Sequence, residues 1–135
     1  MNAPTWRELL TAYAGMGDAS LRDLEDAAEG ISNLVPSHEI PDFYREYNSV
    51  DLIYEQRYAL NEAARNANLI PDEAGALDLF DLLLGLKNRL QMMKVVAIWI
   101  DGSSEIKAVV QKLVDNLPEG HRNKAMLEAR LNPSR

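Results

Sequence analysis

The 135-residue chain contains no cysteine, which excludes disulfide bonds, thiolate metal sites, iron–sulfur clusters and cysteine nucleophiles. Histidine is also scarce: only His38 and His121 occur, and neither has a second histidine or a carboxylate at ligand spacing on one helix face. The glycine patterns of phosphate-binding loops, dinucleotide sites and nucleophile elbows are missing as well. We therefore favour a non-enzymatic protein, without catalytic residues, a cofactor or a resident metal.

The start of the chain, Met1-Asn2-Ala3-Pro4, lacks both the basic segment and the apolar run of a secretory leader. Apolar residues make up 47% of the chain and charged residues 26%, which is typical of a globular protein. The length suits one domain with a core of its own. We expect a single helical domain over residues 1–135, located in the cytoplasm and not attached to a membrane.

Basic residues are rare in the first part of the chain, where no lysine precedes Lys87. Residues 1–81 hold 16 acidic and 5 basic side chains, a net charge of −11, whereas residues 82–135 hold 5 and 9, a net charge of +4. The negative field of the first part repels nucleic acid and attracts basic partners. Solubility alone is the alternative explanation of this acidity.

Helix signals mark the N-terminal half. Thr5-Trp6-Arg7-Glu8 is a capping-box pattern that predicts a helix from Trp6 to Ala14, ended by Gly15. Asp18 or Ser20 caps a second helix that ends before Pro36 and is expected to bury Leu21, Leu24, Ala28 and Ile31. A third helix is predicted from Pro41 towards Asn66, either continuous or divided at Asn48-Ser49.

The strongest periodicity follows Pro71. Apolar residues recur at helical spacing along Leu79, Leu82, Leu83, Leu86, Leu90, Met93, Ala97 and Ile100. The opposite side of the helix becomes apolar at Met92, Val95 and Trp99. Residues 94–100 therefore form either a helix without a solvent-facing side or a short strand. We favour the helix, because the sequence has no second strand pattern nearby with which such a strand could pair.

Two further helices are predicted, from Ser103 or Asp101 to Leu117 and from Glu119 to Leu131, separated by Pro118. The pattern as a whole predicts an all-α, single-domain bundle of about five or six helices, with the Leu79–Ile100 segment as its central element.

A line of tyrosines marks the candidate partner surface. Tyr47, Asp51, Tyr54 and Tyr58 follow steps of four, three and four on the predicted third helix. Tyrosine is enriched at protein interfaces because it buries a large area at low entropic cost and keeps a polar tip. The predicted partner-binding residues are Tyr44, Tyr47, Asp51, Tyr54, Glu55 and Tyr58. The alternative is that these rings fill the core.

Paired carboxylates support an enzyme alternative. Asp26 and Glu29 stand three residues apart, as do Asp78 and Asp81, and the stretch from Asp78 to Leu86 resembles the leucine-rich second helix of the all-α nucleoside-triphosphate pyrophosphatases. The resemblance implies a magnesium-dependent pyrophosphohydrolase with these four acids as ligands. Gly75 stands where that family has a glutamate, so the metal set is incomplete.

Three functions follow from these patterns. The first is a non-enzymatic binding domain that engages a basic protein, in an immunity, antitoxin or chaperone-like role such as those of small acidic bacterial proteins. The second is the magnesium-dependent pyrophosphohydrolase. The third is a structural subunit that forms homodimers through Met92, Val95 and Trp99, provided the last two helices leave them exposed.

Overall fold

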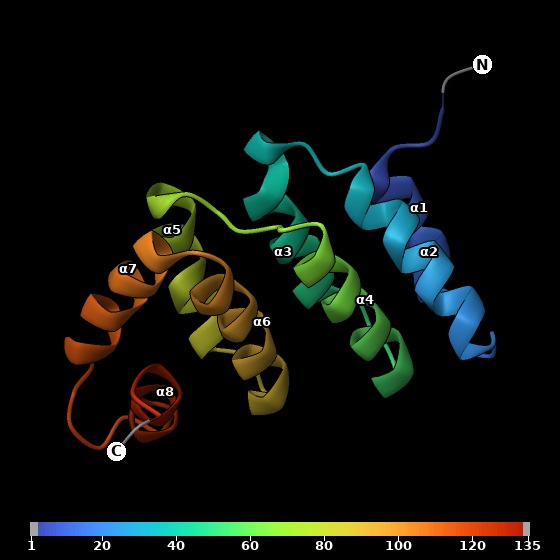
Figure 1. Cartoon of the computed structure of the whole chain (residues 1–135). Coiled ribbons are helices and arrows are strands. Elements are labelled where there is room, and N and C mark those ends of the chain that lie inside the picture. The colour runs from blue at the N-terminus through green and yellow to red at the C-terminus, as the bar shows by residue number, and fades with distance from the viewer. Residues whose placement is uncertain (1–2, 134–135) are drawn as a thin grey trace. The chain divides into compact units, whose positions relative to one another are not determined.

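A computed structural model describes residues 3–133, which contain eight α-helices, one short 3-10 helix and no β-strand (Figure 1). The elements in chain order are α1 (Trp6–Ala14), α2 (Leu21–Asn33), η1 (Ser37–Glu39), α3 (Ile40–Ser49), α4 (Tyr54–Asn66), α5 (Glu73–Leu84), α6 (Arg89–Gly102), α7 (Ser104–Asp115) and α8 (Lys124–Leu131). The all-α class is confirmed. The predicted number of helices is wrong, because the two longest predicted helices are each divided in two.

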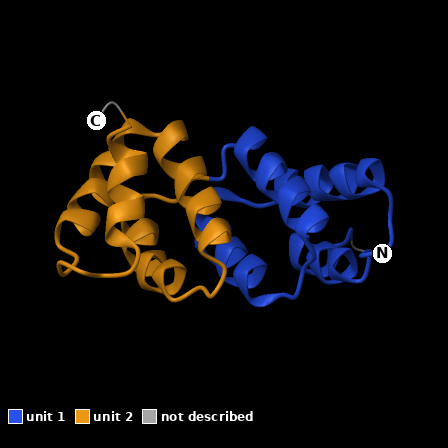
Figure 2. Cartoon of the chain, turned by 90° about the horizontal axis from the view of Figure 1, so that it is seen from below, with its two compact units in different colours: residues 1–69 blue, residues 70–135 orange. Residues whose placement is uncertain are grey.

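The chain separates into two compact units, residues 1–69 (unit 1) and residues 70–135 (unit 2) (Figure 2). Unit 1 contains α1 to α4, and unit 2 contains α5 to α8. Each is within the size range of small domains that fold alone, and a single domain over the whole chain stays a prediction. The leader pattern sought at Met1 and Asn2 lies outside the described residues. No helix within residues 3–133 combines the length and apolar character needed to cross a bilayer.

In unit 1, α2 packs against both α4 and α1, and α1 also contacts α3. The predicted capping box is present: the Thr5 hydroxyl accepts from the Glu8 backbone N–H at 3.2 Å, and the Glu8 carboxylate accepts from the Thr5 N–H at 3.3 Å. Phe43 lies at the centre of an aromatic cluster, with ring centroids 5.9 Å from Trp6 and 5.1 Å from Tyr44. On α2, Leu24, Ala28 and Ile31 are buried as predicted, whereas Leu21 is exposed.

The predicted helix from Pro41 to Asn66 is divided near Asn48-Ser49, which was one of the two predicted alternatives. Helix α3 ends at Ser49, and Val50 is extended, with φ −85° and ψ 153°. A new helix begins at Tyr54, where the Gln56 side-chain oxygen accepts from the Ile53 N–H at 3.0 Å. Residues 47, 51, 54 and 58 therefore do not share a continuous helical line, and that part of the prediction is wrong.

The predicted Leu79–Ile100 helix is also divided. Gly85 caps the end of α5, and the Asn88 side chain accepts from the Gln91 N–H at 3.0 Å to begin α6. Nor is this segment the centre of its unit, because α7 is the helix that packs against each of α5, α6 and α8. Leu90, expected on the buried line, is 72% exposed because it falls in the first turn after the break.

Residues 94–100 are helical, which confirms the favoured alternative. All six residues from Val95 to Ile100 are buried, because α6 packs against both α7 and α8 and needs no solvent-facing side. The last helix begins at Lys124 rather than Glu119. The preceding turn is held by Arg89, which donates to the Arg122 carbonyl at 2.6 Å and to the Asn123 side chain at 3.1 Å.

Candidate interaction surface

The net charge of the chain comes entirely from unit 1. Its residues include 12 acidic and 5 basic side chains, a net charge of −7, whereas unit 2 has 9 of each. A charge of this size on fewer than 70 residues attracts cationic partners over roughly a Debye length, about 8 Å at physiological ionic strength. A surface that selects a partner by charge is therefore best sought on α1 to α4.

Two of the six predicted partner-binding residues belong to the core. Tyr44 is 0% exposed and its hydroxyl donates to the Leu69 carbonyl at 2.6 Å. Tyr47 is 2% exposed and donates to the Asn61 side-chain oxygen at 2.7 Å. Burial of a tyrosine is favourable when its hydroxyl finds such a partner. These rings pack inside unit 1 and present no surface to another protein.

The other four predicted residues, Asp51, Tyr54, Glu55 and Tyr58, are exposed around the first two turns of α4. Tyr54 is 60% exposed and Tyr58 is 41% exposed. Their rings are stacked, with centroids 6.4 Å apart and an interplanar angle of 27°. We call these four residues, a stacked aromatic pair and two exposed carboxylates close to it in the sequence, the tyrosine patch.

A groove of about 330 Å³ lies between α2 and α4. Helix α2 contributes two glutamates and an asparagine, and α4 contributes a glutamate, an asparagine and a row of alanines. The lining residues are Glu25, Glu29, Asn33, Ala59, Glu62, Ala63, Asn66 and Ala67. Ala59 and Ala63 are buried while the three glutamates are exposed, so the groove has an apolar floor and an acidic rim.

Sequence reasoning missed this groove, although two signals were present. Glu25 and Glu29 stand one turn apart, and Ala59, Ala63 and Ala67 recur at four-residue steps, which lets a neighbouring helix approach. Glu62, on the rim of the groove, follows Tyr58 of the tyrosine patch by one helical turn.

The acidic side chains of the groove and the patch are unpaired. Glu25, Glu29, Asp51, Glu55 and Glu62 form no ion pair and accept no side-chain hydrogen bond from any residue in the range 3–133. Carboxylates clustered without a cation repel one another. A cationic ligand would relieve that repulsion.

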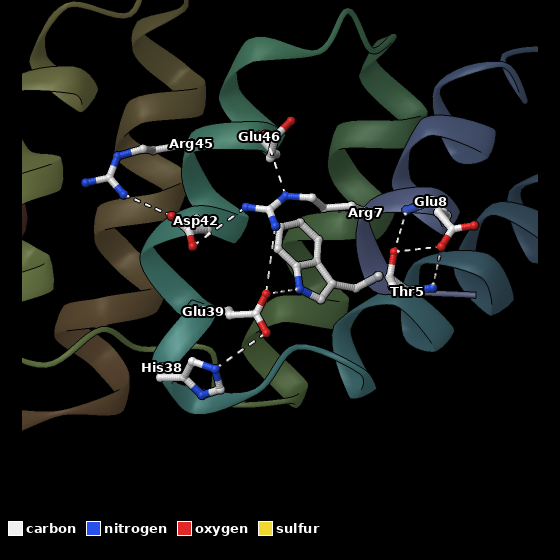
Figure 3. Close-up of polar contacts among 9 residues, drawn as sticks. Thr5, Arg7, Glu8, His38, Glu39, Asp42, Arg45 and Glu46 are labelled. Carbon is white, nitrogen blue, oxygen red and sulfur yellow. Dashed lines mark hydrogen bonds and ion pairs between the residues drawn. The ribbon is translucent and has the colours of Figure 1, made fainter. Parts of the chain in front are cut away.

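A second acidic row on unit 1 already has a cation of the chain as its partner. The Arg7 guanidinium lies 3.9 Å from Glu39, 3.6 Å from Asp42 and 3.8 Å from Glu46, and its central carbon is 4.8 Å from the centroid of the Trp6 ring (Figure 3). The Trp6 indole N–H donates to Glu39 at 3.2 Å. Arg7 thereby links α1 to η1 and α3, and this cluster stabilises the unit.

The four acids of the enzyme alternative belong to different units of the chain. Asp26 and Glu29 lie on α2 of unit 1, whereas Asp78 and Asp81 lie on α5 of unit 2. Within the described part of the chain, no three His, Asp or Glu side chains are grouped so that they could hold a metal ion. The pyrophosphohydrolase alternative stays a prediction.

The predicted homodimer patch is also not at the surface. Met92, Val95 and Trp99 are each 0% exposed. They lie on α6, which α7 and α8 cover, as one alternative of the sequence analysis allowed.

Comparison with known proteins gives no assignment: no protein-family model, no curated protein and no solved structure matches the chain.

Proposed function

We propose that the protein is a non-enzymatic, cytoplasmic binding protein whose unit 1 holds a basic segment of another protein, in an immunity, antitoxin or chaperone-like role. The observation that carries the proposal is the set of five unpaired carboxylates around the α2–α4 groove and the tyrosine patch. The floor of the groove is apolar, and so are the faces of the two exposed tyrosine rings. The surface thus supplies both charge and contact area to one ligand.

The expected affinity follows from the number of contacts. An exposed ion pair contributes about 0.2–1 kcal/mol, so three to five pairs contribute roughly 1–5 kcal/mol together with faster association. Burial of the tyrosine rings adds apolar contact, and tyrosine is a frequent hot-spot residue. A short basic peptide is therefore expected to bind with a Kd of about 10 μM to 1 mM. The binding should become weaker as salt is added.

The test uses a fluorescently labelled basic peptide and two triple variants with the same change in net charge. The groove variant carries Glu25→Gln, Glu29→Gln and Glu62→Gln. The control carries Glu73→Gln, Asp81→Asn and Glu105→Gln, three exposed acids of unit 2. Fluorescence anisotropy should show binding weakened about tenfold by the groove variant and less than twofold by the control. Equal weakening by both would show that only net charge matters and would reject the proposed surface.

A further inference from the structure

The exposed part of α4 has the composition of an arginine site. Stacked aromatic rings at Tyr54 and Tyr58 lie beside carboxylates at Glu55 and Glu62 on the same helix. We infer that this surface selects arginine over lysine in its partner, with one guanidinium on the tyrosine patch and a second in the α2–α4 groove. The inference rests on the proposed function and adds the chemical identity of the ligand.

Unit 1 already contains one arginine held in this way. Arg7 lies over the Trp6 ring at 4.8 Å and has three carboxylates within 4 Å (Figure 3). That arrangement combines an aromatic face, which attracts a cation, with carboxylates that form ion pairs with the guanidinium. The tyrosine patch offers exposed aromatic faces and carboxylates, and the groove offers further carboxylates without a ring.

The preference for arginine follows from the chemistry of the two cations. A guanidinium is planar and weakly hydrated, so it stacks on a ring while its edge donates to carboxylates. A lysine ammonium is strongly hydrated and acts as a point charge, so it gains from the carboxylates but little from the rings. Because Tyr54 and Tyr58 expose 60% and 41% of their surface, both rings have area available for stacking.

The spacing of the two arginines follows from the helix. Along the axis of α4 the tyrosine patch is centred near residue 56 and the groove near residue 63, and a helix rises 1.5 Å per residue, so the two are separated by about 10 Å in that direction. The tyrosines and the groove alanines also lie on different sides of the helix, so this distance is the minimum that a ligand spans. An extended chain covers about 10 Å in about three residues, so the favoured ligand is a segment with two arginines at least three positions apart.

The test compares two labelled twelve-residue Gly/Ser peptides of equal charge by fluorescence anisotropy on the full chain. Both carry two flanking lysines; one has two arginines three residues apart, and its twin has two lysines there. We expect the arginine peptide to bind about three to five times more tightly. In the variant Tyr54→Leu/Tyr58→Leu this ratio should fall to about one, with the affinity of the lysine peptide changed less than twofold.

The matched control is Leu77→Ala/Leu90→Ala, which alters two exposed apolar residues of unit 2 and should keep the wild-type ratio. Equal wild-type affinity for both peptides overturns the arginine inference but leaves the proposed function intact, as does a ratio that survives loss of the tyrosine rings. Failure of both peptides to bind the wild-type chain rejects the proposed function as well. Circular dichroism of each variant confirms that it is folded.

Discussion

Gln56 provides a quantitative test of the packing that positions α4. It is 1% exposed, and its side-chain amide donates to the Tyr13 carbonyl at 2.6 Å while its side-chain oxygen accepts from the Ile53 N–H at 3.0 Å. In return the Tyr13 hydroxyl donates to the Gln56 carbonyl at 2.6 Å. The two bonds with Tyr13 connect the last turn of α1 to the first turn of α4, and the bond from Ile53 caps the start of α4.

The substitution Gln56→Leu removes two of these bonds and keeps the size of the side chain. A hydrogen bond contributes about 0.5–1.5 kcal/mol net. The Tyr13 carbonyl still accepts from the Met16 N–H at 2.9 Å, and exposed Ile53 lies close enough to water for partial compensation. The free energy of unfolding should therefore fall by about 1–3 kcal/mol.

Urea unfolding followed by far-UV circular dichroism measures this loss. The control Gln111→Leu alters a glutamine on α7 that donates to the exposed Asp115, one turn later, at 2.9 Å, and should change the free energy of unfolding by less than about 0.5 kcal/mol. A Gln56→Leu protein as stable as the wild type would refute the inference that this network holds α1 to α4.

Four further predictions concern other elements. Burial raises the pKa of Tyr13 above its usual 10.0, so on raising the pH the hydroxyl loses its proton in the unfolded chain before it does so in the folded one. The free energy of unfolding, measured in urea, should therefore fall as the pH rises above about 10, and it should fall less steeply in the variant Tyr13→Phe. Arg7→Met should lower stability by about 0.5–1 kcal/mol at low salt and less at 1 M salt, with exposed Arg22→Met as the control. Asn88→Ala should cost about 1 kcal/mol in urea unfolding through loss of the α6 cap. Trp99→Ala should cost about 3–5 kcal/mol by the same measurement, because the ring is fully buried; a stable variant would contradict that burial.

Local signals predicted the helix boundaries best. The first helix was predicted at Trp6 to Ala14 and lies there, because its cap depends only on Thr5 and Glu8, three residues apart. The break between α5 and α6 was missed, although Gly85 and Asn88 are ordinary stop and start residues. The apolar repeat continues with almost the same spacing across the break, so periodicity alone joined the two helices.

The candidate site was predictable only in part, because burial depends on distant contacts. Tyr44 is buried through its bond to Leu69 and Tyr47 through its bond to Asn61, and neither pairing follows from the spacing of the tyrosines. Tyr54 and Tyr58 are exposed because a new helix begins at residue 54 and turns them outward. The groove joins residues at least 26 positions apart, so it first appears when α2 and α4 are packed together.

The central claim is that the acidic face formed by α2 and α4 receives a cationic segment, and chemical-shift mapping by nuclear magnetic resonance tests it most directly. The arginine peptide is titrated into the ¹⁵N-labelled full-length protein at low salt. If the acidic face binds the peptide, saturable shifts are expected on the amides around Glu25, Glu29, Tyr54, Tyr58 and Glu62. Shifts concentrated in residues 70–135, or none at all, would contradict it.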